Sequence, residues 1–495
     1  MPLRRFAPLA SLGGGLAAAL SLPPWGWWPL GVVGLAVAAW CLHGVERDAG
    51  EPVLGALQPE YGLERAQNHE RAAWRRRALV GLGFGLGMFL PGLWWVTEFH
   101  AVGYVVLTLL QTSFFVGAFA LCRAWWAFPG ALVLAEAARS VVPFGGLPLS
   151  GLVLGQASGP FVASARVGGA LLVLGVVAAL STVATGRHRS AAAIAPAIVI
   201  VALGWVAPAG KALDREHEAA LVQGGGPRGF RATETDAGEV FDRHLHVSER
   251  LSPRGLDLVL WPENAVDVAQ LEGSAEADEL AALARRTGAT LVAGVTEDAV
   301  GDRFRNVAVV WSPDGEVIDR YVKVHRVPFG EYVPGRGLFE RLVDLSVLPR
   351  DAVAGRGDGT ALTPVGRVAI AISYEVFFAE RTRSGVRGGG VVVLVPTNAA
   401  SFATSQVPGQ EVAAARLRAW ETGRWVLQAA PTGYTAVIDH RGRVLERSTL
   451  GRAETLRTTF ERRVELTWYV RYGDAPVVLL ALVLVALPWV RGFRR

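Results

Sequence analysis

The first half of the chain is a series of long apolar segments separated by short polar connections. A segment of about 20 mostly apolar residues is long enough to cross the hydrocarbon core of a bilayer as a helix. Such segments lie at 6–22, 25–44, 78–96, 101–122, 124–142, 167–186 and 190–208, and another follows a long polar region at 475–490. The pattern predicts a polytopic α-helical membrane bundle of about eight spans.

Between the seventh and eighth predicted spans, short apolar runs alternate with amphipathic stretches. Ser274–Arg286 and Glu411–Arg424 have the spacing of helices. Turn signals at Pro313-Asp314-Gly315 and His440-Arg441-Gly442 predict hairpins. The runs that predict strands are Ala219–Gln223, Leu256–Leu260, Thr290–Val295, Val368–Ile372 and Val391–Val395. We expect a transmembrane bundle at 1–212, an α/β domain at 213–470, and a last transmembrane helix with a basic tail at 471–495.

Composition supports the membrane interpretation. Hydrophobic residues make up 51% of the 495 residues and charged residues 19%, whereas ordinary soluble domains have about 25% charged residues. The net charge is +5, and arginines gather in alternate connections between the predicted spans. The positive-inside rule then places both termini in the cytoplasm and the α/β domain on the other side of the membrane. Because basic connections explain the charge, we expect no nucleic-acid partner.

The rare and isolated polar residues of the membrane half give little chemistry. Cys41 and Cys122 are the only cysteines, and they form neither a disulfide framework nor a zinc cluster. No metal-ligand spacing, phosphate-binding loop or nucleotide fingerprint is present, so we expect no metal and no cofactor. Glu136 and Arg139 lie three residues apart in one predicted span, where a structural ion pair and a functional pair both fit the spacing.

Two candidate catalytic side chains follow predicted strands. Glu263 lies in WPEN after the run Leu256–Leu260, and Ser373 lies in SYE at the end of Val368–Ile372. Loops at strand ends commonly carry catalytic groups, because the strand fixes the backbone while the loop admits substrate. A single glutamate in such a loop is usually solvated. Ser373 fits both an exposed nucleophile at a strand-to-helix turn and a helix N-cap.

The third candidate, Lys323, is the most informative residue. Lysine occurs only at Lys211 and Lys323, and every other residue among the 49 Lys and Arg is arginine. A chain that otherwise uses arginine therefore has a specific need for an ammonium at this position. A compact ammonium can lie against a developing oxyanion, which a planar guanidinium does less well. We interpret Lys323 as catalytic rather than as a chance placement.

These motifs resemble the apolipoprotein N-acyltransferase family. The most specific element is KxHxVPFGEYVP, which begins at Lys323, whereas a strand ending in WPE is common across the nitrilase superfamily. The resemblance covers essentially the whole chain. It implies a multi-pass protein of the bacterial inner membrane with an extracytoplasmic nitrilase-like domain, an α-β-β-α sandwich.

The same resemblance implies a Glu-Lys-Cys triad, carried over by position. Glu263 would be the general base, Lys323 would stabilise the tetrahedral oxyanion, and position 373 would hold the nucleophile. Glu331 corresponds to a second carboxylate that positions the lysine and the nucleophile. The remaining supporting or substrate-binding positions are Trp261, Asn306, Tyr374, Glu375 and Asn398.

The implied reaction is a ping-pong acyl transfer. The nucleophile takes a fatty acyl chain from a phospholipid, and the N-terminal amine of a diacylglyceryl-cysteine lipoprotein accepts it. We expect phospholipid, lipoprotein and the bilayer as partners, and a monomer. Two alternatives stay open: a membrane-anchored nitrilase-like amidase, and a weak or inactive homologue that binds lipid or lipoprotein.

The chain departs from the family pattern at the nucleophile, because Ser373 stands where the family has cysteine. A thiol has a pKa of ~8.5 and an alcohol one near ~15.7, so ionising serine costs roughly 10 kcal/mol more. A carboxylate of ordinary pKa, ~4.3, is poorly matched to that task unless burial raises it. His325 is the one histidine beside these loops. Ser373 is a working oxygen nucleophile, an introduced substitution, or the mark of a homologue with little transferase chemistry.

Residues 335–355 have an amphipathic pattern, with leucine, valine and phenylalanine among arginine and aspartate. Such a segment could lie at the bilayer surface and admit an acyl chain. Packing of its apolar side chains against the domain is an equally fair interpretation.

Overall fold

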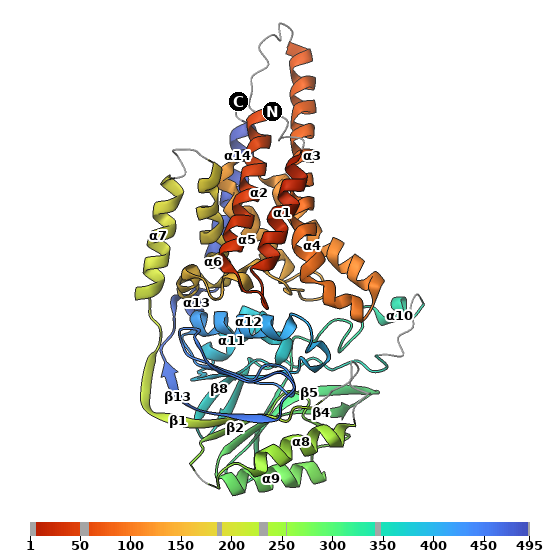
Figure 1. The fold of residues 1–495 in the computed structure, drawn as a ribbon, viewed down its shortest axis with the longest axis vertical. Coiled ribbons are helices and arrows are strands. Elements are labelled where there is room, and N and C mark those ends of the chain that lie inside the picture. The colour runs from red at the N-terminus through yellow and green to blue at the C-terminus, as the bar shows by residue number, and fades with distance from the viewer. Residues whose placement is uncertain are drawn as a thin grey trace. The chain divides into compact units, whose positions relative to one another are not determined.

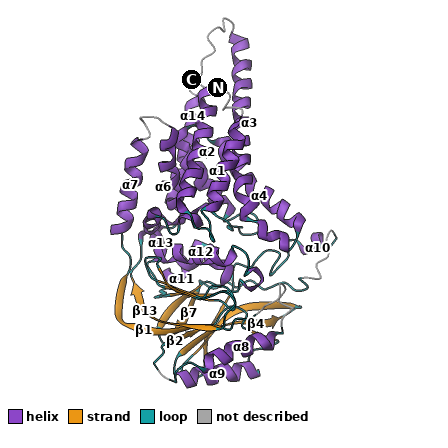
Figure 2. Cartoon of the chain, viewed as in Figure 1, coloured by secondary structure: helices purple, strands orange, loops and turns teal. Residues whose placement is uncertain are grey.

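The computed structural model describes residues 6–49, 59–185, 191–226, 236–253, 255–341 and 348–493 (Figure 1). By their internal contacts the residues form two compact units: Met1–Ala207 with Tyr472–Arg495, and Pro208–Arg471. The first unit is helical, and the second contains the strands (Figure 2). The chain therefore leaves the helical unit after residue 207 and returns to it at residue 472.

Each position at which the sequence predicts a span carries a helix. The α-helices are α1 (Ala7–Leu20), α2 (Trp28–Ala49), α3 (Pro59–Gly92), α4 (Ala101–Leu121), α5 (Phe128–Arg139), α6 (Ala165–Ser181), α7 (Ala191–Val206) and α14 (Ala475–Phe493). Short 3-10 helices accompany them: η2 (Trp94–Glu98), η3 (Trp125–Ala127), η4 (Leu152–Gln156), η5 (Pro160–Ser164) and η6 (Thr182–Thr185). Contacts run from α2 through α1, α3, α4 and α5 to α6, which returns to α2, while α14 packs on α5.

The predicted count of eight spans is not confirmed. Among the described residues, two helical segments are long and apolar enough to cross a membrane, Ala101–Leu121 and Pro160–Ser181. The apolar helices at the two ends of the chain are shorter. The predicted span 124–142 is interrupted, because α5 ends at Arg139 and the chain continues in turns and 3-10 helices.

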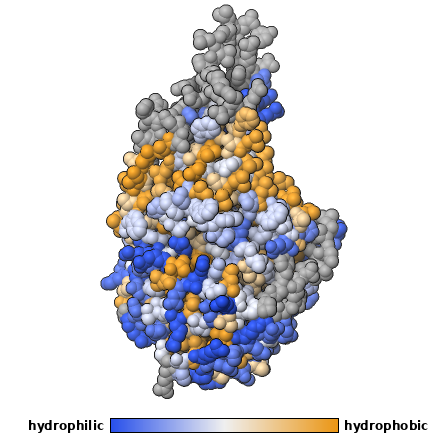
Figure 3. Space-filling model, in the orientation of Figure 1, coloured by the Kyte–Doolittle hydropathy of each residue, from blue (hydrophilic) through white to orange (hydrophobic). Residues whose placement is uncertain are grey.

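Apolar side chains lie exposed on the helical unit, as Figure 3 shows in orange. On α4 the exposed side chains include Val102, Val105, Val106 and Leu109, and on α14 they include Leu479, Leu480, Leu482 and Val483. Contiguous exposed apolar surface of this kind marks a site of interaction with another apolar phase or partner.

Small residues allow α1 and α3 to approach closely. A Cβ atom at Gly83 would collide with the carbonyl oxygen of Pro8, and one at Gly87 with that of Leu12. The two glycines are four residues apart and so lie on one face of α3. A small-xxx-small pair of this type is typical of helix packing in membranes, where backbone proximity replaces the hydrophobic effect.

The charged pair in α5 is a structural element. Arg139 Nη1 donates to Glu136 Oε1 at 2.7 Å, and Nη2 donates to the Leu149 carbonyl at 2.6 Å. The guanidinium also donates to Gln111 on α4, and its side chain is fully buried. Because these partners tie α5 to α4 and to the following loop, the geometry favours the structural interpretation over the functional one.

The second unit contains two β-sheets. The first has the strand order β13-β1-β2-β4-β5-β6, with β3 beside β4, and the second has the order β12-β11-β10-β9-β8-β7. The first sheet is formed by β1 (Lys211–Gln223), β2 (Leu258–Leu260), β3 (Val266–Val268), β4 (Thr290–Ala299), β5 (Arg303–Trp311), β6 (Val317–Val322) and β13 (Glu454–Val464). The second is formed by β7 (Thr360–Thr363), β8 (Gly366–Ile370), β9 (Val393–Pro396), β10 (Val426–Ala429), β11 (Ala436–Ile438) and β12 (Val444–Arg447).

Helices cover the outer faces of both sheets, which gives the expected α-β-β-α sandwich (Figure 2). One apolar core lies between the sheets and includes Leu221, Leu260, Ile370 and Leu427. A second core joins the first sheet to α8 (Ala237–Glu249) and α9 (Ala275–Thr287). The second sheet is covered by α11 (Ala379–Arg387) and α12 (Val407–Thr422), and the short helices are η9 (Ser373–Phe377), η10 (Ala400–Phe402), α10 (Arg336–Phe339) and α13 (Trp468–Tyr472).

Local predictions in this unit fare well. Both predicted hairpin turns connect antiparallel strands, β5 to β6 and β11 to β12. Helix α9 begins directly after Ser274, whose hydroxyl accepts from the N–H of Ala277 as an N-cap. Helix α12 begins four residues before the predicted start, with Pro408 in its first turn, where proline is tolerated because its missing N–H would be unpaired there in any case.

Candidate active site

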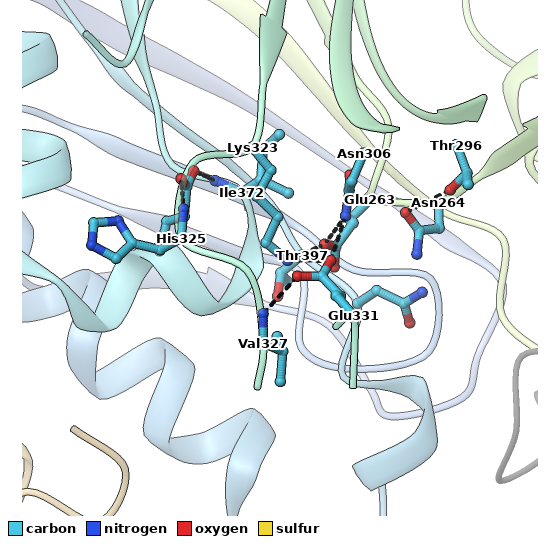
Figure 4. Close-up of polar contacts among 12 residues, drawn as sticks. Glu263, Asn264, Thr296, Asn306, Lys323, His325, Val327, Glu331, Ile372 and Thr397 are labelled. Atoms are coloured by element: carbon cyan, nitrogen blue, oxygen red, sulfur yellow. Dashed lines mark hydrogen bonds and ion pairs between the residues drawn. The ribbon is translucent and has the colours of Figure 1, made fainter. Parts of the chain in front are cut away.

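Lys323 lies at the centre of a buried charge cluster just after β6. Its Nζ donates to Glu263 Oε1 at 2.7 Å and to Glu331 Oε1 at 2.9 Å (Figure 4). The lysine side chain is 2% exposed. Glu263 comes from the loop after β2, whereas Lys323 and Glu331 come from the loop after β6. The loops after β2 and β6, which are far apart in sequence, therefore bring two carboxylates and one ammonium together.

Asn306 on β5 holds the two carboxylates together. Its Nδ2 donates to Glu263 Oε1 at 2.7 Å and to Glu331 Oε1 at 2.9 Å. The other oxygen of Glu331 accepts from the N–H of Val327 at 2.7 Å, and Figure 4 shows these groups converging. The same atoms therefore receive an amide and an ammonium, which fixes the orientation of both carboxylates.

The lysine is held as an ammonium. Burial acts to lower the pKa of Lys323, but the carboxylates of Glu263 and Glu331 outweigh it and raise this pKa above its usual range. A protonated amine between two carboxylates can donate to an oxyanion. It is a poor general base, which agrees with the electrophilic role that the resemblance implies.

Glu375 joins the Lys323 loop to the Ser373 turn. Its Oε1 accepts from the N–H groups of Val324 and His325 at 2.8 and 3.0 Å, and its Oε2 accepts from the N–H of Ile372 at 2.9 Å. The hydroxyl of Tyr321 donates to the same carboxyl at 3.0 Å. Burial raises the pKa of Glu375, and these N–H groups oppose the rise. Glu375 therefore fixes the backbone of the two loops by accepting their N–H hydrogen bonds.

Ser373 occupies a strained turn after β8. Its φ is 49°, in the left-handed region that residues other than glycine rarely adopt, and the residue is 7% exposed. Strain of this kind persists where the surroundings enforce it, often at functional sites. Ile372 is the N-cap of η9 and Phe378 that of α11, so the N-cap interpretation of Ser373 is wrong.

Glu411 on α12 is a further buried carboxyl at this site, and no motif in the sequence marked it. Thr397 Oγ1 donates to its Oε1 at 2.7 Å. Burial raises the pKa of Glu411 to about 8; the Glu263 carboxylate adds to the rise, while Thr397, Lys323 and the Ser373 hydroxyl oppose it. All of these groups are therefore close enough to act on one carboxyl, which joins Ser373 to the cluster around Lys323.

Three predicted supporting residues lie outside the charge cluster. The Trp261 side chain is fully buried among the residues under α8, where its Nε1 donates to Ser248 Oγ at 3.0 Å. Tyr374 is almost fully buried, and its ring contacts that of Phe378. Asn398 accepts from the N–H of Ala400 and shapes a local turn. Their roles toward substrate stay predictions.

His325 is not arranged as a base for Ser373. Its ring stacks on Phe378 with the ring centroids 4.2 Å apart, and Figure 4 shows it on the far side of the strand end from Glu263. Burial and the nearby Arg381 guanidinium lower the pKa of this histidine. The Ser373 hydroxyl acts instead on the carboxyl of Glu411.

The amphipathic segment 335–355 is described only in part. Residues 342–347 lie outside the described residues, and so do the side chains of residues 338 and 339. Before them Arg336 pairs with Asp351 through its Nη2 and Oδ1 at 2.5 Å. This pair joins a residue before the undescribed stretch to one after it. The role of the segment in lipid access stays a prediction.

Among the described residues, no group of three or more His, Cys, Asp or Glu side chains is arranged to hold a metal ion. Cys41 and Cys122 both belong to the helical unit and are buried.

Comparison with known proteins identifies both halves of the chain. The model of the apolipoprotein N-acyltransferase N-terminal domain matches residues 14–183, and the carbon-nitrogen hydrolase model matches residues 218–465. The apolipoprotein N-acyltransferase of Mycolicibacterium smegmatis is 30% identical to the chain over 98% of its length and 85% of that of the relative. The chain belongs to the apolipoprotein N-acyltransferase family.

Other apolipoprotein N-acyltransferases are similar over comparable lengths. That of Pseudomonas aeruginosa is 28% identical over 96% of this chain and 94% of its own. Solved structures are similar over about half of the chain. Saccharomyces cerevisiae Nit3, of branch 10 of the nitrilase superfamily, is 22% identical with a TM-score of 0.40 over 51% of this chain and 92% of its own. An amidase from Nesterenkonia sp. is 20% identical with a TM-score of 0.38 over 54% and 98%.

Proposed function

We propose that the protein transfers a fatty acyl chain from a membrane phospholipid to the N-terminal amine of a diacylglyceryl-cysteine lipoprotein, through an ester on Ser373. The observation that carries the proposal is the buried Lys323 ammonium, held by Glu263 and Glu331 and joined to the strained Ser373 turn through Glu375. Family membership supplies the substrate classes.

Each group has a defined task in this proposal. The Ser373 oxygen attacks the ester carbonyl of the phospholipid while a neighbouring carboxylate, Glu263 by the resemblance, takes its proton. The Lys323 ammonium donates to the oxyanion that develops on the carbonyl oxygen. The lysophospholipid leaves, and the lipoprotein amine attacks the resulting ester. Amide and free serine are the products.

The proposed setting is the bacterial inner membrane, with the bundle as anchor. The exposed apolar faces of α4 and α14 and the close packing of α1 on α3 support it. Eight spans, cytoplasmic termini and an extracytoplasmic α/β domain are the finer parts of the proposal.

Intact-mass analysis tests the acyl-enzyme. The full chain in detergent, incubated with phosphatidylethanolamine, should gain the mass of one fatty acyl group, and a Ser373→Ala control should gain none. Addition of a diacylglyceryl lipopeptide should then discharge the ester and N-acylate the peptide. Ser373→Cys should react faster, because a thiolate forms far more readily than an alkoxide.

The competing functions give different outcomes. Release of ammonia from a short amide without N-acylation would favour the amidase, which the carbon-nitrogen hydrolase match supports. If neither the serine form nor Ser373→Cys takes up an acyl group while the chain still binds phospholipid, the transferase proposal is wrong and a binding role replaces it.

A further inference from the structure

Glu411 is a buried carboxyl that the mechanism above leaves without a task. It lies in the second turn of α12 and is 3% exposed. Its Oε1 accepts from Thr397, whereas Oε2 is buried and has no partner within normal hydrogen-bond geometry in the described part of the chain. Leaving a polar oxygen buried without a hydrogen-bond partner is costly, so a carboxyl at this position needs a reason.

Helix α12, which carries Glu411, packs against η9, which begins at Ser373. The groups that act on its carboxyl are Thr397, the Ser373 hydroxyl, the Lys323 ammonium and the Glu263 carboxylate. Among them only the Ser373 hydroxyl carries a proton that must leave during nucleophilic attack, because Lys323 is held protonated by two carboxylates. Glu263 Oε1 already accepts from both Lys323 and Asn306.

Serine makes a stronger demand on the base than cysteine does. An alkoxide lies roughly 10 kcal/mol above a thiolate at equal pH, so the proton must move as the carbon-oxygen bond forms. A base works best when its pKa is near the working pH. Burial raises the pKa of Glu411 to about 8, which brings this carboxyl closer to that match than an ordinary glutamate.

We propose that Glu411 is a catalytic residue, whose carboxylate accepts the Ser373 hydroxyl proton during acyl transfer. The inference rests on the proposed function and moves the base role from Glu263 to Glu411 for the serine form of the enzyme. Glu263 then serves with Glu331 to hold Lys323 against the oxyanion.

The proton is balanced in both half-reactions. In the first, Ser373 Oγ bonds to the acyl carbon, Glu411 takes the hydroxyl proton, and the ester carbon-oxygen bond of the phospholipid breaks as Glu411 returns that proton to the leaving alcohol oxygen. In the second, the lipoprotein amine bonds to the acyl carbon, Glu411 takes an amine proton, and it returns this proton to Ser373 Oγ as the ester breaks. No redox partner is needed.

A double-variant experiment tests the assignment. Acyl-enzyme formation with phosphatidylethanolamine is timed for the full-length parent, Glu411→Gln, Ser373→Cys and the double variant. Glu411→Gln should slow the serine enzyme by about 100-fold or more, the usual effect of losing a general base. In the Ser373→Cys background the loss should be below about 10-fold, because a thiol ionises with little help. The parent rate should rise with pH and level off above about pH 8, and Glu411→Gln should remove this rise.

Glutamine at position 411 keeps the shape of the side chain and can still accept the hydrogen bond from Thr397. The matched control is Glu380→Gln, which makes the same exchange at an exposed glutamate of α11 and should react like the parent. Equal losses in the serine and cysteine backgrounds would reveal a structural role and overturn the inference while the proposed function stands. If neither the parent nor Ser373→Cys takes up an acyl group, the proposed function is wrong, and the inference falls with it.

Discussion

At the scale of single residues, four glutamates of the site have the same side chain and different partners. Glu263 and Glu331 face an ammonium, Glu375 faces backbone N–H groups, and Glu411 faces hydroxyls. A carboxyl that receives an ammonium or several N–H groups is stabilised as an anion, whereas one that is only buried favours its proton. The partners therefore distinguish three roles: Glu263 and Glu331 hold the lysine, Glu375 holds the backbone, and Glu411 is a candidate proton acceptor.

The pH dependence of stability follows from Glu411. Burial raises its pKa from 4.5 to about 8, so between these values the folded chain binds a proton that the unfolded chain has released. Stability from this group is present at low pH and falls as the pH rises toward about 8, by up to roughly 5 kcal/mol at 1.36 kcal/mol per unit. Glu411→Gln should therefore unfold at a higher temperature than the parent at about pH 9, by several degrees, with a smaller gap at about pH 5. Scanning calorimetry or dye-monitored unfolding measures the gap, and a gap that stays constant with pH would contradict the shift.

The sequence identified some of these residues and missed others for physical reasons. Lys323 stood out because the chain almost never uses lysine, and Glu263 because it ends a buried strand. Glu331 came only from the resemblance. Glu411 was hidden because it was taken as the first residue of a helix, where acids commonly compensate the helix dipole. The packing of α12 on η9 brings it near Ser373.

At the scale of elements, one carboxyl connects the two sheets of the sandwich at the site. Glu375 in η9, after β8 of the second sheet, accepts from the backbone after β6 of the first sheet. The Ser373 turn and the Lys323 loop are therefore held in position relative to each other by the hydrogen bonds of Glu375.

Removing this tie should loosen the site. Glu375→Gln leaves one acceptor oxygen and places an amide NH2 group, itself a donor, opposite the N–H groups of Val324, His325 and Ile372, so at least one buried N–H loses its partner. The cost is about 1–3 kcal/mol, together with a loss of acyl transfer as the two loops separate. Tyr321→Phe is the milder control, since it removes a single donor. Thermal unfolding and the acylation rate report the effect, and a Glu375→Gln enzyme with parental values for both would refute the tie.

Elements were predicted well where the pattern was local. Hairpin turns and the helix predicted at Ser274–Arg286 depend on residues close together in the sequence, and both predictions were correct. The predicted span 124–142 is not confirmed, because α5 ends at Arg139, whose guanidinium donates to the Leu149 carbonyl in the following loop. An apolar run alone cannot report such a partner.

At the scale of the whole molecule, two units of different chemistry share one chain. The helical unit has apolar side chains on its outside, whereas the α/β unit buries its apolar residues in two cores. The sequence predicted this division from hydropathy alone. The number of spans and the side of the membrane need long-range packing and charge placement, which hydropathy does not supply.

Reporter fusions check the orientation. Alkaline phosphatase inserted at the exposed turn around Val300 should be active, because the positive-inside rule places the α/β unit outside the cytoplasm. Green fluorescent protein fused after residue 495 should fluoresce, since it folds in the cytoplasm. An inactive phosphatase with a silent C-terminal fusion would reverse the orientation, and disagreement between the two reporters would change the parity of the spans.

Because the chain has only two lysines, chemical modification of lysine can report when the candidate site opens. Lys211 is exposed and Lys323 is buried between two carboxylates, and they are the only side-chain amines. Acetylating reagents or amine-directed dyes will therefore modify residue 211 in the folded chain and reach residue 323 only when the charge cluster separates. Peptide mapping of the modification at Lys323 would then measure how often the candidate site opens, with no engineered probe.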